Sequence, residues 1–162
     1  MSGEEELATE SRLKIFEKEL DNLIESIGIS FVKDSVSTDA LELTYEALLK
    51  IDPRECLILN YKLHQYGLYI QSLYNRAENI KNWANHNINI VAGKEGSNYG
   101  DKWTKWEEKK AMVISGNSFA KALNDIYLKS SSKSTELSGI SMKIEKIAYA
   151  LHELSKKKEN NG

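Results

Sequence analysis

The stretch 53-PRECLILNYKLHQYGLYIQSLYNRAENIKNWANHNINI-90 decides the fold of this chain. Pro53 suits the first helical position, and Asp52 with Glu55 has the spacing of a capping box. Apolar residues then recur at alternating steps of three and four, which is the period of one helix face. The stretch predicts a helix over residues 53–90, with a reach of about 55 Å. The predicted seam comprises Cys56, Leu59, Leu63, Tyr66, Ile70, Leu73, Ala77, Ile80 and Ala84.

A second group of apolar side chains lies off this seam, at Leu57, Tyr61, Leu68, Tyr69 and Tyr74. A helix that is apolar along more than one stripe buries more than one face. We therefore expect the helix over 53–90 to have more than one packing partner.

The C-terminal part of the chain carries a second long apolar pattern. Its register runs through the serine-rich stretch 129-KSSSKSTEL-137 without gaining or losing a residue. This predicts a single helix over about 102–155, with a polar step at Ser130 and Lys133. The alternative is a break near 130–135 that would give two helices. The predicted seam comprises Met112, Gly116, Phe119, Leu123, Ile126, Ser130, Lys133, Leu137, Ile140, Ile144, Ile147, Leu151 and Leu154.

The connections between helices are marked by glycines and capping residues. Gly93, Gly96 and Gly100 indicate a loop, after which Asp101 can cap the C-terminal helix. Before residue 53, a first helix carries a seam that Gly28 ends, and residues 29–37 form a connector. A shorter second helix over Leu41, Tyr45, Leu48 and Leu49 follows a cap at Ser37 or Thr38. The first seam consists of Leu13, Phe16, Leu20, Leu23 and Ile27.

These elements predict an all-α fold, a long antiparallel helical hairpin or coiled coil with two shorter N-terminal helices. Residues 7–155 form a single helical domain, residues 1–6 a disordered acidic tail and residues 156–162 a disordered basic tail. Such a hairpin has more apolar seam than one chain can bury, which favours a homo-oligomer. The residues expected to assemble it are Leu123, Ile126, Leu137, Ile140, Ile144, Ile147 and Leu151.

Charge is divided unevenly along the 162 residues, although the net charge is only -2. Residues 1–80 hold 15 acidic and 8 basic side chains, whereas residues 81–162 hold 9 and 14. The two halves could attract each other, and the basic half could meet phosphates or simply be solvated. No window approaches the apolar length of a membrane span, and the acidic start is unlike a signal peptide. We expect a cytoplasmic protein that contacts no membrane.

The sequence shows no arrangement of residues that would carry catalysis. Cys56 is the only cysteine, so no intramolecular disulfide or cysteine-based metal site forms. The three histidines, His64, His86 and His152, are far apart, and no phosphate-binding glycine motif or nucleophile elbow is present. We expect a protein that is not an enzyme and has no metal and no cofactor.

Aromatic and basic side chains alternate around 97-SNYGDKWTKWEEKKAM-112. Bases stack on aromatic rings and lysines attract phosphates, so this composition favours a surface for single-stranded nucleic acid. The alternative is that Trp103 and Trp106 anchor the hairpin tip against Trp83 and Ile80, with solvated lysines around them. The candidate nucleic-acid-binding residues are Lys81, Lys94, Tyr99, Lys102, Trp103, Lys105, Lys109 and Lys110.

Four segments resemble the UvsY-type recombination mediators of tailed phages. They are 41-LELTYEALL-49, 93-GKEGSNYG-100, 108-EKKAMVISGNSFAKALNDIYL-128 and 143-KIEKIAYAL-151. The resemblance spans roughly residues 38–151 and is one of layout and hydrophobic spacing. It implies small helical proteins that assemble into rings, bind single-stranded DNA and help a recombinase displace a single-strand-binding protein. A phage-encoded protein of this kind would work in the host cytoplasm.

The first functional hypothesis is therefore a non-enzymatic phage recombination mediator. It would bind single-stranded DNA as a homo-oligomer and assist recombinase loading, with the recombinase and a single-strand-binding protein as partners. The alternative is a coiled-coil scaffold or adaptor that acts only through protein–protein contacts. A third hypothesis is a small phage-type inhibitor of a host enzyme that uses the acidic N-terminal half.

Overall fold

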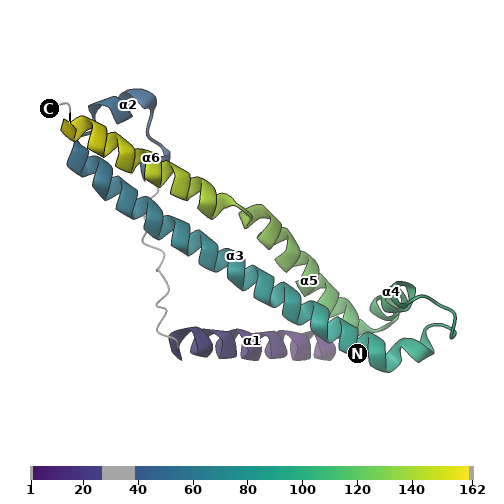
Figure 1. The fold of residues 1–162 in the computed structure, drawn as a ribbon. Helices are drawn as coiled ribbons and strands as arrows, with labels where there is room; N and C mark the ends of the chain where they lie inside the picture. The colour runs from purple at the N-terminus through teal and green to yellow at the C-terminus, as the bar shows by residue number, and fades with distance from the viewer. Residues whose placement is uncertain (1, 27–38, 161–162) are drawn as a thin grey trace. The chain divides into compact units, whose positions relative to one another are not determined.

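The computed structural model describes residues 2–26 and 39–160 (Figure 1). Every regular element in these residues is helical, which confirms the all-α class. The elements are α1 (Ser2–Ser26), η1 (Asp39–Leu41), α2 (Tyr45–Lys50), α3 (Pro53–Glu95), η2 (Gly96–Asn98), α4 (Trp106–Gly116), α5 (Ser118–Leu137) and α6 (Ile140–Asn160). No helix in the described part of the chain is long and apolar enough to cross a membrane.

The chain divides into two compact units, and α3 contributes residues to both. Unit 1 comprises Met1–Ser30 and Asn75–Glu136, and unit 2 comprises Phe31–Tyr74 and Leu137–Gly162. Unit 1 contains α1, the second half of α3, η2, α4 and nearly all of α5. Unit 2 contains η1, α2, the first half of α3 and α6.

The start of α3 follows the signals in its sequence. The helix begins at Pro53, and the Asp52 carboxylate accepts a hydrogen bond of 2.8 Å from the backbone N–H of Glu55. This bond satisfies one of the backbone N–H groups in the first turn of α3 that have no partner within the helix, as the capping spacing predicts. At its other end α3 passes Gly93 and continues to Glu95, so the loop starts later than predicted.

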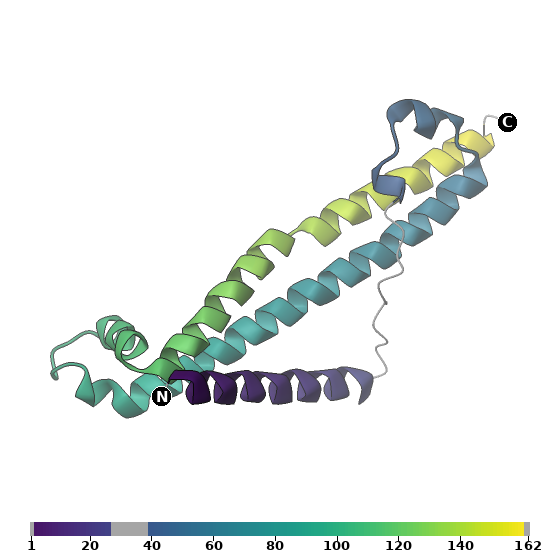
Figure 2. The same cartoon turned by 180° about the vertical axis from the view of Figure 1, so that it is seen from behind.

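The single helix predicted over 102–155 is wrong, because the chain breaks twice in this region. One break is at Asn117, between α4 and α5, and the other separates α5 from α6 (Figure 2). The second contains Gly139, whose φ of 73° is a left-handed conformation that glycine adopts without strain. The serine-rich stretch lies within α5, so the alternative break near 130–135 is also wrong.

The serine-rich part of α5 satisfies its own hydroxyl groups along the helix. The hydroxyls of Ser134 and Thr135 both donate to the backbone carbonyl of Ser131, at 3.0 and 2.9 Å. Ser130 and Ser134 are also buried, so they contribute to a packed face of the helix. A composition that is typical of a linker is therefore compatible with a helix here.

The terminal helices are longer than the apolar pattern predicts. α1 is helical from Ser2, and α6 continues to Asn160 instead of fraying at residue 156. Lys158 accounts for part of that extension, because its ammonium donates to the carbonyls of Leu48, Leu49 and Ile51 at the end of α2.

The second helix is shorter than predicted. α2 begins at Tyr45, and Thr44 caps it through a 3.2 Å hydrogen bond from the N–H of Ala47. The predicted stop at Gly28, the caps at Ser37 or Thr38 and the connector 29–37 lie outside the described residues.

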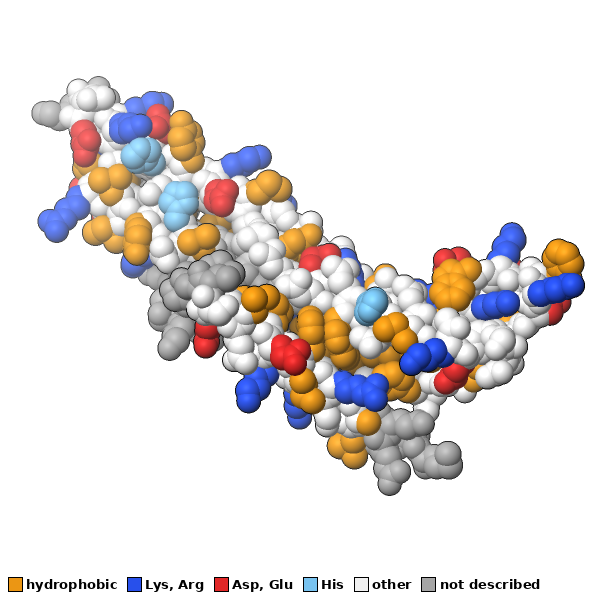
Figure 3. Space-filling view, turned by 60° about the horizontal axis from the view of Figure 1, so that its bottom comes forward, with side chains coloured by type: hydrophobic (Ala, Val, Ile, Leu, Met, Phe, Trp, Pro, Cys, Tyr) orange, Lys and Arg blue, Asp and Glu red, His pale blue; other side chains and the backbone are white. Residues whose placement is uncertain are grey.

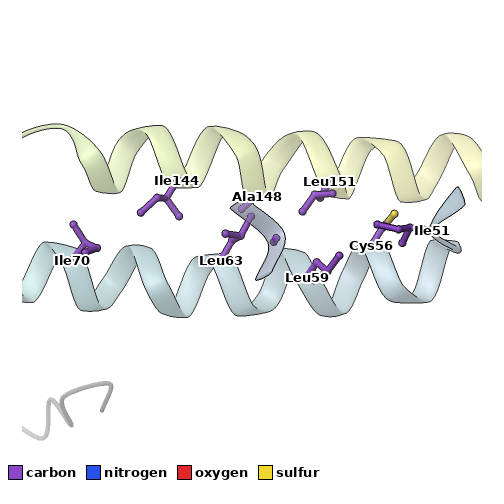
Figure 4. Close-up of a cluster of buried hydrophobic side chains, with 9 residues drawn as sticks. Ile51, Cys56, Leu59, Leu63, Ile70, Ile144, Ala148 and Leu151 are labelled. Carbon is purple, nitrogen blue, oxygen red and sulfur yellow. The ribbon is translucent and has the colours of Figure 1, made fainter. Parts of the chain in front are cut away.

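Unit 2 has a core between the first half of α3 and α6 (Figure 4). Polar contacts pair Pro53 with Ser155, Asn60 with Ala148 and Gln71 with Ser141, so the two segments run antiparallel. η1 and α2 add further apolar side chains to this core. Its buried members are Ala40, Ile51, Cys56, Leu59, Leu63, Ile70, Ile144, Ala148 and Leu151. Burial raises the pKa of the Cys56 thiol, which suits a neutral core side chain.

The buried stripe of the C-terminal helices differs from the predicted seam at most of its alternate positions. Leu123, Ser130, Ile144 and Leu151 are buried as predicted. The other buried residues of the stripe each lie one position later in the sequence than the predicted residue, and most are small. They are Val113, Ala120, Ser134, Ser141, Ala148 and Ser155. Small side chains let two helix backbones approach closely, so the larger predicted partners turn outward, and Met112 and Ile147 are 46% and 42% exposed.

Unit 1 combines a small core with contacts from α1. Ala92, Val113 and Ala120 form a buried cluster where α3, α4 and α5 meet. In α1, Phe16 stacks on Trp83 of α3 with ring centroids 5.5 Å apart. The Arg76 guanidinium pairs with Asp21 at 2.7 Å and Glu17 at 3.3 Å. Phe16 of the predicted α1 seam therefore has a partner within its own unit, whereas Leu23 of the same seam is 59% exposed.

Candidate nucleic-acid interface

The candidate site lies in unit 1, on η2, α4 and the loop that joins them. The Asp101 carboxylate organises this loop by accepting bonds from the N–H groups of Trp103 and Thr104, at 2.8 and 2.9 Å, and from the Thr104 hydroxyl at 3.0 Å. These bonds, led by the one from Trp103, lower the pKa of Asp101 and keep it ionised at neutral pH. Asp101 thus caps a turn of the loop, and α4 begins later, at Trp106.

The Tyr99 side chain holds the other side of the loop. Its ring packs against the Ala92, Val113 and Ala120 cluster, and it occupies the space in which a side chain on Gly116 would lie. Tyr99 is therefore half-buried, and its ring supports the loop from inside.

Trp103 is the most exposed large hydrophobic side chain in the described part of the chain, at 80%. The Lys102 ammonium lies 5.1 Å from the centroid of its ring, within the range of a cation–π contact. Trp106, at the first position of α4, is 46% exposed. Because the loop keeps the Trp103 indole exposed to solvent, the ring is available to stack against a ligand.

Some of the predicted lysines are exposed, and others are bonded to neighbouring side chains. Lys94, Lys102 and Lys105 are exposed, and Lys109 is half-buried. Lys110 donates to the side-chain carbonyl of Asn85 at 2.9 Å. Lys81 pairs with Glu78, and this hydrogen bond is the main cause that lowers the pKa of the Glu78 carboxyl. Figure 3 shows basic and hydrophobic side chains together over α4 and the loop before it.

The tip-anchoring alternative is wrong for Trp103, because that side chain is exposed. Trp83 takes Phe16 of α1 as its stacking partner instead. Sequence reasoning missed this contact because Phe16 and Trp83 are distant along the chain and no local pattern links them.

Two acidic residues near the loop are engaged with neighbouring groups. The Glu95 carboxylate accepts a bond of 2.8 Å from the Asn117 amide, and Asp101 binds donors inside the loop. Glu107 and Glu108 remain exposed in the first turn of α4, where the helix dipole favours negative charge. The exposed lysines are therefore opposed mainly by these two glutamates.

The predicted oligomerisation residues lie mostly in contacts within the chain. Leu123, Ile144 and Leu151 are buried, and Leu137 and Ile140 pack against the core of unit 2. Ile126 is half-buried, and Ile147 is 42% exposed. Burial of the first three side chains within one chain leaves them unavailable to a second copy.

No group of three or more His, Cys, Asp or Glu side chains that could hold a metal ion occurs among residues 2–26 and 39–160. The described chemistry at the loop is that of an exposed indole and ammonium groups. Comparison of the chain with protein-family models, curated proteins and solved structures gives no match. The resemblance to UvsY-type mediators therefore stays a prediction.

Proposed function

We propose that this chain is a non-enzymatic accessory protein that binds single-stranded DNA and assists recombinase loading as a homo-oligomer. The observation that supports this most is Trp103, 80% exposed on a loop that Asp101 holds in place. Stacking of one base on an aromatic side chain contributes about 1–3 kcal/mol and requires no particular base. Lys94, Lys102 and Lys105 supply ammonium groups for the phosphates beside it.

The proposal includes a long antiparallel hairpin formed by α3 and the C-terminal helices. Contacts within each unit support this arrangement. In unit 2, Asn60 of α3 meets Ala148 of α6, and in unit 1, Glu95 of α3 meets Asn117 at the start of α5. The early part of α3 thus pairs with the late C-terminal helix and its end pairs with an earlier one, as an antiparallel hairpin requires.

Fluorescence polarisation with a labelled single-stranded oligonucleotide tests the DNA-binding proposal. We expect binding that weakens steeply with salt, and Trp103→Ala should weaken it by roughly 5- to 150-fold, which corresponds to the loss of one stacked base. The triple variant Lys94→Glu, Lys102→Glu, Lys105→Glu should remove three phosphate contacts and reduce the salt slope by about 2.

The matched control reverses three exposed lysines of α5, Lys121, Lys129 and Lys133, and so changes the net charge equally. This control should bind DNA more strongly than the loop variant. Absence of binding by the wild-type protein at low salt, or equal loss in both triple variants, would contradict the proposed site.

A scaffold function is the second candidate, and a specific feature of α3 favours it. The helix exposes Leu57, Tyr61 and Leu68 at 41%, 65% and 56%. Large apolar side chains on one helix face are typical of a protein–protein contact. A protein that self-associates but binds no oligonucleotide would support this candidate instead of the first.

A further inference from the structure

The first half of α3 is almost free of charge. Of the twenty residues Cys56–Asn75, only Lys62 is charged, although charged residues make up 28% of the whole chain. Helix faces that meet water normally carry charges, whereas the centres of protein interfaces are depleted of them. One side of this segment packs on α6, yet the depletion extends around the helix to side chains that are exposed.

Leu57, Tyr61 and Leu68 form one exposed stripe on this segment. Each residue of an α-helix advances by about 100°, which places these three about 120–160° from the buried Leu63. Lys62 lies on the other side of the helix by the same calculation. The stripe is thus separate from the core of unit 2.

α6 carries a matching pair of exposed side chains. Met142 and Tyr149 are 62% and 63% exposed and lie about 100–120° from the buried Ala148, in the same rotational sense. The helices α3 and α6 run antiparallel. Exposed side chains that are offset in the same rotational sense from the buried residues of each helix therefore lie on the same side of the helix pair. η1 and α2 border a groove on α6. Ile147 and Leu154 line it in the opposite rotational sense, and the groove extends round the helix to Tyr149.

We infer that this surface, made by Leu57, Tyr61 and Leu68 of α3 with Met142 and Tyr149 of α6, is a self-association face that binds a second copy of the chain. Figure 3 shows hydrophobic side chains at the surface over α3 and α6. The inference names the contact for the homo-oligomer of the proposed function, and it does not depend on DNA binding.

The area of the face is sufficient for a dimer. Five large side chains, each about half exposed, present roughly 500–600 Å² of apolar surface in one protomer. Two copies would bury about 1,000–1,200 Å² before any polar rim is counted, and specific interfaces bury about 1,200–2,000 Å² in total. The exposed patch also reaches the upper end of what monomers usually leave uncovered.

The charges around the face favour a copy of the same chain over a partner of opposite charge. Between Leu57 and Leu68 the only charged residue of α3 is Lys62, on the other side of the helix, so two copies meet without repulsion along these residues. Glu145 and Lys146 stand between Met142 and Tyr149 on α6, and these four residues line one shallow surface depression. Across a two-fold axis, the glutamate of one copy could pair with the lysine of the other, whereas a strongly charged partner would find no complement.

Sedimentation velocity of the full chain at micromolar concentration tests this inference. We expect the wild-type protein to be a dimer or a larger even-numbered oligomer. Leu68→Lys and Met142→Lys should each raise the dissociation constant about tenfold or more, because each places a charge in the apolar centre of the contact. Leu49→Lys is the matched control, since Leu49 of α2 is 58% exposed, close to the 56% of Leu68, and should leave the oligomer intact.

Circular dichroism of each variant shows whether the helices persist, and both test substitutions are at exposed positions. A wild-type monomer throughout the concentration range would overturn the inference. So would an unchanged dissociation constant in both test variants, or an equal effect of Leu49→Lys. Oligonucleotide binding measured on the same samples separates the two proposals. A dimer that ignores DNA removes the proposed DNA binding and leaves the inference, whereas a monomer that binds DNA removes the inference and the homo-oligomer and leaves the proposed DNA binding.

Discussion

Gly116 ends α4 at a place where the chain has no room for a side chain. A Cβ atom there would overlap the Tyr99 ring, which packs beneath the candidate interface. Gly93, by contrast, lies inside α3, and a Cβ atom at that position would have no neighbouring atom within 4 Å. Gly116 is therefore required by the packing around it, whereas Gly93 can be replaced by a residue with a side chain.

Gly116→Ala should destabilise the protein and displace Tyr99, whereas Gly93→Ala should stabilise it by about 0.5–1 kcal/mol, because alanine favours the helical conformation. Urea unfolding of both variants measures the change in the free energy of unfolding. Stabilisation by Gly116→Ala, or destabilisation by Gly93→Ala, would contradict the packing described at these sites.

Asp101 makes the order of the loop dependent on pH. Its pKa is lowered in the folded protein, so its contribution to stability is present above the unfolded value of about 3.9 and is lost as the pH falls through the folded value. The amide signals of Trp103 and Thr104 should therefore stay constant near neutral pH and change only at acidic pH, below about 4, in an NMR titration.

Asp101→Asn retains an acceptor oxygen without a titrating group, so its amide signals should not follow this transition. Titration of the Trp103 amide at or above the ordinary carboxyl pKa would show that Asp101 does not hold the loop.

At the scale of the helices, close packing of small side chains joins α3 to α5 and α6. Ala148 is fully buried beside α3, and Gly67 of α3 would place a Cβ 3.6 Å from Ile144. A pattern of apolar residues does not distinguish this arrangement, because serine and alanine carry little hydrophobic signal. The sequence therefore predicts which helices form more reliably than which of two adjacent stripes they bury.

Ala148→Leu should cost about 1–3 kcal/mol, because the added carbon atoms separate α6 from α3. Ala150→Leu is the control on the same helix, since Ala150 is exposed beside an open groove and has room for a larger side chain. Chemical unfolding of the two variants compares them, and equal midpoints would contradict the small-residue packing.

At the scale of the whole molecule, local signals predict the helices and distant contacts decide the candidate site. Asp52 and Pro53 mark the start of α3, as predicted. The breaks at Asn117 and Gly139 escaped prediction because the apolar register continues through both. Likewise, the aromatic and basic composition near Trp103 is visible in the sequence, but its exposure depends on how Asp101 and Tyr99 fold the loop.

The division of α3 between two units has a consequence for biosynthesis. Unit 2 takes its segments from Phe31–Tyr74 and from Leu137–Gly162, with most of unit 1 encoded between them. During translation, the first half of α3 leaves the ribosome long before α6 exists to cover Leu63 and Ile70. The nascent polypeptide must therefore keep this apolar segment from aggregating until the residues of α6 have been synthesised.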